Sequence, residues 1–192
     1  TDRRVSGRRS RRGFATAAAS LAFALSASVP VFNRMFAQLL HCLDIAEKHA
    51  GERKIKLEVL VAARLAPDMH PLSFQFQSAT DRAKLFLARV SGREAPRWED
   101  GEKTFDDLRA RVKKAQDFIA TFTPADLDGL EDKAVTLRIS GADVQMRADD
   151  YLFHNLYPNW FFHLATAYDI LRHNGVPIGK ADFVGRAPVI AG

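Results

Sequence analysis

Cysteine is almost absent from this chain of 192 residues, which contains only Cys42. A single cysteine cannot form an internal disulfide or a paired-cysteine zinc motif. The sequence also lacks a glycine-rich phosphate-binding loop and the G-x-S-x-G turn of many serine hydrolases. Cys42 lies on the apolar side of a predicted helix, so we expect it to pack in the core and not to act as a nucleophile.

Most of the chain carries no net charge of either sign. The formal net charge is +5 and the pI is about 9.6. Residues 1–12 contain six arginines and one aspartate, which supply this whole excess, and the charges of the remaining chain cancel. We therefore expect a neutral folded body and no nucleic-acid partner, because a duplex-binding face needs a basic surface. The length and the 47% hydrophobic content suit one well-buried domain.

No apolar run is long enough for a membrane span, so none is expected. The N-terminus nevertheless has the order of a twin-arginine export signal, in which Arg11 and Arg12 precede a short apolar run and small residues. Cleavage between about Ala24 and Ser28 would then deliver the protein to the periplasm. The preferred interpretation is that the protein is cytoplasmic and that these residues are translated upstream sequence or a disordered basic tail; export is the alternative. In both cases the fold is expected to begin near Val29.

Four segments carry apolar residues at helical spacing, which predicts four long amphipathic helices. These helices are expected at about 29–50, 71–90, 104–122 and 151–175, with a short helix at about 57–64. Thr104 and Asp107 resemble a capping box at the start of the third long helix. The apolar stripes of the first three consist of Phe32, Met35, Phe36, Leu39, Leu43 and Ala46; Leu72, Phe76, Ala79, Ala83, Phe86 and Val90; and Phe105, Leu108, Val112, Ala115, Ile119 and Phe122.

A short segment before the last helix alternates apolar and polar residues on both sides of Gly141, which predicts a β-hairpin. The alternating apolar residues are Val135, Leu137, Ile139, Val144 and Met146. The predicted fold class is all-α, a four-helix bundle with one short extra helix and a small β-hairpin before the last helix. We place the bundle domain at 28–186, after an N-terminal extension over 1–27 and before a tail over 187–192.

The last predicted helix places His163 within an otherwise apolar stripe. At about 100° per residue, the side of the helix that carries His163 is apolar, while His154 and Arg172 project to the opposite side. A buried imidazole without a partner costs about 1–3 kcal/mol, so we expect His163 to be paired inside the protein. The stripe residues around it are Leu152, Leu156, Trp160, Ala167 and Ile170.

Three segments of the chain resemble a known family. They are SVPVFNRM at 28–35, RLAPDMHPL at 64–72 and PNWFFHLATAYDILRHNGVPIGKADF at 158–183. Together they resemble an uncharacterised bacterial branch of the DinB/YfiT-like superfamily, over essentially all of residues 28–185. The resemblance implies a DinB-like four-helix bundle. Many relatives hold a divalent metal with three histidines, and some are thiol-dependent transferases or isomerases.

The resemblance also implies positions for a metal site. His163 keeps the register of one histidine ligand, and the earlier ligand position falls on Asn159. The third ligand is expected from the helix at 71–90, which contains no histidine, and Gln77 and Asp81 are its nearest polar candidates. The residues that keep the register after His163 are Leu171, Arg172 and Gly175.

This set leaves three interpretations open. Amide oxygens are poor ligands for zinc or nickel, although one imidazole and one carboxylate could still hold a divalent metal. In the first interpretation there is no cofactor, and Asn159 and His163 are remnants joined by hydrogen bonds to Asp81 or Gln77. In the second the set binds zinc or nickel, and in the third His163 is a metal-free catalytic histidine.

Two functions correspond to these interpretations. The first function is that of a metal-free binding or structural protein with a degenerate site. The alternative is a divalent-metal-dependent hydrolase or transferase that acts on a small molecule in the cleft between helices. Whether the protein is an enzyme stays open at this point.

Other histidines have simpler interpretations. His41 and His49 are expected at solvated or boundary positions, because no carboxylate accompanies them at ligand spacing. His70 and Asp68 could do acid–base work, yet Asp68 is expected to turn the chain before the next helix. His173 lies where a helix ends, and a basic residue there complements the helix dipole.

Aromatic side chains surround nearly the whole last helix. They are Tyr157, Trp160, Phe161 and Phe162. One side of a helix is enough to face a core, so part of this surface is expected to be covered by another subunit. The sequence therefore predicts a homodimer.

Overall fold

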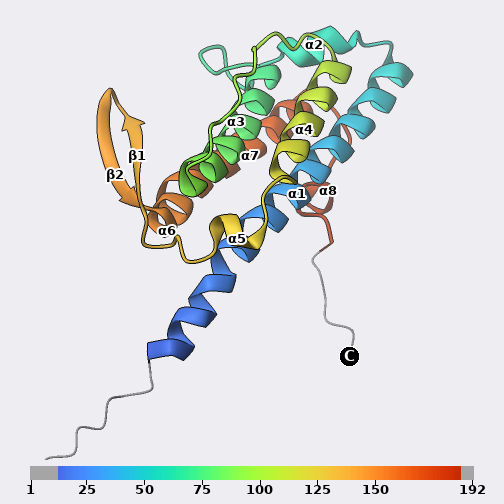
Figure 1. Ribbon diagram of the computed structural model, residues 1–192. Helices are drawn as coiled ribbons and strands as arrows, with labels where there is room; N and C mark the ends of the chain where they lie inside the picture. The colour runs from blue at the N-terminus through green and yellow to red at the C-terminus, as the bar shows by residue number, and fades with distance from the viewer. Residues whose placement is uncertain (1–12, 187–192) are drawn as a thin grey trace, which may run out of the picture.

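Four long helices form the bundle in the computed structural model, which describes residues 13–186, with side chains from residue 27 onward (Figure 1). They are α1 (Gly13–Arg53), α3 (Leu72–Ser91), α4 (Phe105–Ile119) and α7 (Tyr157–His173). Contacts between helices run from α1 to α4, from α4 to α3, from α3 to α7 and from α7 back to α1. Each long helix therefore has two long neighbours around one core.

Shorter elements connect and extend the bundle. The two strands pair antiparallel, with Leu137 opposite Val144, and the hairpin stands beside α3 and α7 in Figure 1. An all-α bundle with a short helix and a β-hairpin before the last helix is therefore confirmed. The shorter elements are α2 (Leu57–Ala62), α5 (Pro124–Leu127), β1 (Ala134–Ile139), β2 (Ala142–Arg147), α6 (Ala148–Asp150), the π-helix η1 (Tyr151–Leu156) and α8 (Lys180–Val184).

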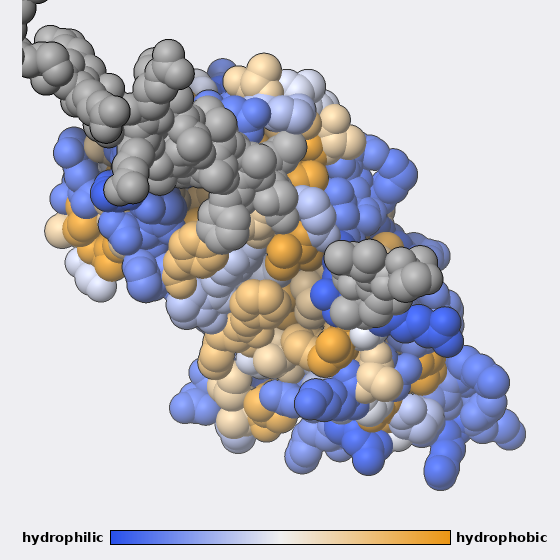
Figure 2. Space-filling model, turned by 90° about the horizontal axis from the view of Figure 1, so that it is seen from below, coloured by the Kyte–Doolittle hydropathy of each residue, from blue (hydrophilic) through white to orange (hydrophobic). Residues whose placement is uncertain are grey.

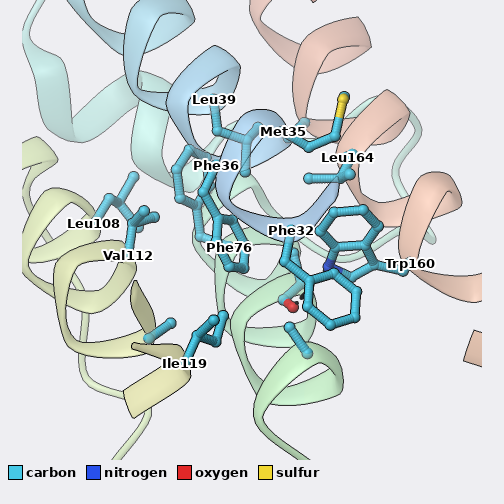
Figure 3. Close-up of a cluster of buried hydrophobic side chains, with 14 of the residues drawn as sticks. Phe32, Met35, Phe36, Leu39, Phe76, Leu108, Val112, Ile119, Trp160 and Leu164 are labelled. Carbon is cyan, nitrogen blue, oxygen red and sulfur yellow. Dashed lines mark hydrogen bonds between the residues drawn. The ribbon is translucent and has the colours of Figure 1, made fainter. Parts of the chain in front are cut away.

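The core is built from the predicted apolar stripes, and every residue of the three stripes named above is buried. Figure 3 shows how these side chains meet between α1, α3, α4 and α7. Phe32 lies edge-on to the ring of Trp160, with ring centroids 5.0 Å apart. Trp160 is fully buried, and its indole N–H donates to the carbonyl of Ala79 at 2.9 Å. This hydrogen bond satisfies the polar atom that a buried tryptophan carries and ties α7 to α3.

Helix α1 differs from the prediction, because it begins at Gly13 and not near Val29. Pro30 consequently lies inside the helix instead of in its first turn. Arg11 and Arg12 lie outside the described residues. No helix within the described part of the chain is long and apolar enough to cross a membrane.

Two predicted local features are confirmed. Thr104 and Asp107 form a reciprocal capping box at the start of α4, with both side-chain-to-backbone hydrogen bonds present. Cys42 is buried, and burial raises the pKa of its thiol to about 12. A thiol held neutral in this way is not a nucleophile at neutral pH.

The last helix is interrupted where a continuous one was predicted. Residues 151–156 wind as the π-helix η1, and the α-helix α7 resumes at Tyr157. Pro158 lies in the first turn of α7. Proline has no N–H for the carbonyl four residues earlier, and its ring clashes with that carbonyl, so a wider turn is expected at this place.

The helix surface that suggested a dimer is only partly covered within one chain. Trp160 is fully buried, whereas Phe161 is 37% exposed and Phe162 is 55% exposed. Phe153 of η1 is 38% exposed. Figure 2 shows that apolar residues also gather in the middle of the face seen from below. Homodimerisation through the aromatic surface stays a prediction.

We expect Phe162→Ser to convert a dimer into a monomer, because it removes the most exposed aromatic ring from the predicted contact. Light scattering of the purified full chain measures the mass directly. The control is Val59→Ser, which removes an apolar side chain of similar exposure, 57%, from α2. A monomeric mass for the unchanged protein would rule out this dimer.

Candidate functional site

His163 is held by α3 across the bundle, as its apolar surroundings required. The side chain is 8% exposed, and its Nδ1 lies 2.8 Å from Oε1 of Gln75, which is 2% exposed. Phe74 and Phe162 present their ring planes roughly at right angles to the imidazole. The expectation of a buried, paired histidine is confirmed. Its partner, however, is Gln75 and neither Gln77 nor Asp81.

The hydrogen bonds around Gln75 fix the tautomer of His163. The amide nitrogen of Gln75 donates to the backbone carbonyl of His70 at 3.0 Å. A carbonyl can only accept, so Oε1 of Gln75 must face the imidazole, and Nδ1 of His163 must carry the proton. Nε2 therefore keeps its lone pair, and no side chain or backbone group of the described residues hydrogen-bonds to it.

The environment of His163 keeps the imidazole neutral. Burial is the main cause that lowers its pKa to about 4, and the charges of Arg82 and His70 act in the same direction. Arg82 is on α3, seven residues after Gln75, so positive potential reaches this histidine from the same helix. The site is therefore a poor place for an additional positive charge.

This lowered pKa predicts that acid destabilises the fold through His163. Between pH 7 and pH 5 the unfolded chain takes up a proton at this imidazole and the native protein does not, because the unfolded pKa is about 6.5. Between pH 7 and pH 5 we therefore expect the free energy of unfolding to fall by about 2 kcal/mol more in wild type than in His163→Gln. Urea denaturation at both pH values measures it. His154→Gln, which replaces a histidine of η1 whose side chain is 73% exposed, is the matched control for the substitution. Equal losses in wild type and His163→Gln would contradict the assignment.

A cleft of about 470 Å³ lies beside this histidine, between α3, the β-hairpin and the start of the last helix. Phe74 lines it and also contacts the ring of His163, but His163 itself is not part of the lining. The α3 face of the cleft consists of Phe74, Gln77, Ser78, Asp81, Arg82, Leu85 and Arg89. The other walls consist of Asp100, Leu137, Arg138, Ile139, Ser140, Tyr151, Asn155 and Asn159.

The other residues predicted as metal ligands all line this cleft, but each has a different partner. The amide nitrogen of Gln77 donates to Glu102 at 2.7 Å, and that of Asn159 donates to the carbonyl of Asn155 at 2.8 Å. Asp81 is paired with Lys84 at 2.7 Å, and its oxygen also lies 3.1 Å from Nη2 of Arg111. The structure therefore brings Gln77, Asp81 and Asn159 to one cavity without directing them at His163.

This donor set does not fit a divalent metal. The carboxylate of Asp81 already faces two cations, the remaining donors next to it are amides, and the single imidazole lies outside the cleft lining. Zinc and nickel favour imidazole and anionic donors that converge on one point. Within the described residues, no cluster of three or more His, Cys, Asp or Glu side chains is arranged to hold a metal ion.

A buried arginine organises the acidic residues behind the cleft. Arg111 of α4 is 3% exposed, and its Nη1 donates to Glu102 at 3.0 Å and to the carbonyl of Glu99 at 2.9 Å. Its Nε donates to Thr80, while Asp100 and Asp81 complete its charge partners. Lys84 is 4% exposed, and its ammonium lies between Asp81 and the face of the Trp98 ring, 4.1 Å from the centroid. We call Arg111, Lys84, Asp81, Asp100 and Glu102 the buried ion cluster, after its two buried cations; the side chain of Asp100 itself is 57% exposed.

We expect Arg111→Leu to lower the free energy of unfolding by about 3–5 kcal/mol, because it leaves Glu102, whose side chain is only 9% exposed, without its cation. Arg109→Leu, two residues away on α4, is the matched control. Arg109 bonds Asp44 and Glu47 near the surface, and exposed pairs of this kind contribute less than about 1 kcal/mol. Urea denaturation of both variants compares them. Similar losses of unfolding free energy in the two variants would show that the buried ion cluster stabilises the fold no more than the surface pairs of Arg109.

Two arginines of the cleft were missed by the sequence interpretation. Arg82 and Arg89 stand seven residues apart on α3, on the same side as Gln77 and Asp81. Nη1 of Arg89 donates to the hydroxyl of Tyr151 at 3.0 Å. The i, i+7 spacing of two basic residues beside the predicted ligand positions was visible in the sequence. That spacing alone does not distinguish a binding site from a solvated basic face.

The remaining histidines are placed at the surface or in stacking contacts. His41 is half-exposed and lies 3.0 Å from Asp182 of α8, a carboxylate partner that its own helix does not supply. His70 stacks on Phe74 with ring centroids 3.8 Å apart. Neither arrangement brings a second acid or a nucleophile to the imidazole.

Comparison with known proteins agrees with this architecture. Residues 25–184 match the family described as Domain of unknown function (DUF1993). The crystal structure of a DinB family member protein from Shewanella denitrificans, at 1.83 Å resolution, superposes with a TM-score of 0.79. It is 33% identical in sequence, and the match covers 88% of this chain and 95% of that one. No curated protein matches the chain significantly.

Proposed function

The chain belongs to the family described as Domain of unknown function (DUF1993) and has a DinB-like fold, and we propose that it is a metal-free binding protein for a small molecule. The observation that carries this proposal is the cleft of about 470 Å³ between α3, the hairpin and the last helix. Pockets that bind small molecules are typically concave, preformed and lined by apolar side chains with a few convergent polar groups.

The walls of the cleft supply both kinds of contact. Phe74, Leu85 and Leu137 are apolar, while Ser78 and Asn155 present uncharged polar groups from α3 and η1. The elements that form the walls are packed against the core: α3 and the last helix belong to the bundle, and Val135 and Leu137 of the hairpin are buried. A preformed cavity of this kind binds without first paying an ordering cost.

The alternative is a divalent-metal-dependent hydrolase or transferase that uses the same cleft. One observation favours it: Gln75 holds the His163 ring by Nδ1 and leaves the Nε2 lone pair available, as the environment of a metal-bound histidine does. The positive charge of Arg82 near this imidazole and the pairing of Asp81 oppose it. We therefore rank metal-free binding first.

We expect protein purified without chelator or affinity metal to contain no stoichiometric metal by elemental analysis. Adding zinc, nickel or manganese should not raise its thermal midpoint, because a ligand that binds the native state must stabilise it. A stoichiometric metal, together with stabilisation that His163→Gln abolishes, would instead support the metal-dependent alternative.

Small-molecule binding is tested separately with a set of uncharged and charged fragments and isotope-labelled protein. We expect chemical-shift changes to gather at the cleft, and Ser78→Phe to abolish them by filling it. Thr136→Phe, on the exposed side of β1, is the matched control and should leave binding intact. If no fragment perturbs the cleft, or if both variants behave alike, the binding proposal fails.

The location of the protein stays a proposal as well. We propose the cytoplasm, with export through the Arg11–Arg12 motif as the alternative. Ala27 and Ser28 bear on the alternative, because the hydroxyl of Tyr157 donates to the carbonyl of Ala27, and Ser28 is fully buried. Cleavage immediately before Ser28 would therefore remove a packed residue.

A further inference from the structure

The charged groups around the cleft are unequally paired. Both of its carboxylates, Asp81 and Asp100, face cations of the buried ion cluster. Arg82 and Arg89 of α3 line the same cleft, and neither forms an ion pair with a carboxylate of the described residues. The two carboxylates are therefore neutralised by Lys84 and Arg111, while the positive charges of Arg82 and Arg89 stay unpaired in the cleft lining.

Arg82 carries the clearest sign of a missing partner. Its Nε atom is buried and has no hydrogen-bond partner among the described residues. A buried donor that lacks an acceptor is costly, so the protein leaves hydrogen-bonding capacity of this guanidinium unused. Because Nε is enclosed, the terminal Nη atoms are the donors of Arg82 that a molecule in the cleft would reach. Burial also lowers the pKa of this guanidinium, and the nearby charge of Arg89 acts in the same direction.

Tyr151 extends this group of donors. Its hydroxyl accepts from Nη1 of Arg89 at 3.0 Å, and this leaves the phenolic proton free to donate. Burial raises the pKa of Tyr151, so the hydroxyl stays protonated at neutral pH. Arg82, Arg89 and Tyr151 thus present N–H and O–H donors to one cavity from two helices, α3 and η1.

We propose that this cleft binds the oxyanion of a small molecule, a carboxylate or a phosphate group, through Arg82 and Arg89 with Tyr151 as an additional donor. The inference rests on the proposed small-molecule binding and specifies its chemical class. Guanidinium groups suit oxyanions because their planar N–H forks match two oxygens at once. The apolar part of the ligand would face Phe74 and Leu85, which line the same wall.

The test is a chemical-shift titration of the labelled full chain with inorganic phosphate and, separately, with succinate, at ionic strength held constant with sodium chloride. We expect saturable shifts at Arg82, Arg89 and Tyr151 with at least one anion. Saturation by phosphate alone assigns a phosphate group, and saturation by succinate alone assigns a carboxylate.

Three variants make the titration specific. Arg82→Gln should weaken binding at least tenfold, because its charge-assisted hydrogen bonds to the oxyanion are lost. Arg82→Lys keeps the charge but loses the planar N–H fork of the guanidinium and should also weaken binding. Arg97→Gln removes the same charge from an exposed position outside the cleft and should change affinity less than twofold. The spectrum of each variant reports whether it is folded.

The outcomes separate this inference from the proposed function. If neither anion gives saturable shifts at the cleft, or if Arg82→Gln and Arg97→Gln lose the same affinity, the oxyanion inference is overturned. Uncharged fragments that still bind the cleft, in wild type and in Arg82→Gln alike, would then leave the binding function standing. If those fragments also fail to bind, the proposed function falls with it.

Discussion

The ion pairing of Arg111 is the interaction on which the cleft depends. Its guanidinium is almost fully buried between α3 and α4 and needs carboxylates to offset the cost of leaving water. Asp81 comes from α3, whereas Asp100 and Glu102 come from the segment between α3 and α4. The cluster therefore fixes that segment against the bundle. It also pairs with cations the carboxylates that could otherwise have bound a metal. What stays available in the cleft is positive charge.

The sequence predicted the bundle well because its information is periodic. Every residue of the three predicted stripes is buried, and the hairpin is centred on Gly141 as its alternation indicated. Helices α5 and α8 were missed because four or five residues are too few to show a helical period. The interruption at η1 was missed for a different reason. The proline that accompanies it is as compatible with the start of a helix as with a widened turn.

The candidate site was only partly predictable. Burial of His163 followed from its stripe, but the expected partners, Gln77 and Asp81, were wrong, because Gln75 lies within two turns of both on α3 and is the residue that bonds the imidazole. The choice depends on packing: Gln75 is 2% exposed, while Gln77 and Asp81 face the cleft. The resemblance to metal-binding relatives implies ligand positions and carries no information on the arginines of the same face. Their role depends on how each neighbouring charge is paired, and that pairing is a property of the folded chain.

The central claim is that Arg82 lacks its partner until an oxyanion enters the cleft. The Nη–H resonance of the Arg82 side chain tests it most directly, because the Nη atoms are the donors of Arg82 that a molecule in the cleft can reach, whereas Nε is enclosed. On addition of phosphate or succinate, we expect this resonance to shift saturably and its proton to exchange more slowly with water, while the Arg97 resonance stays unchanged. An Arg82 resonance that does not respond to either anion, at concentrations that saturate binding elsewhere on the protein, would contradict the account.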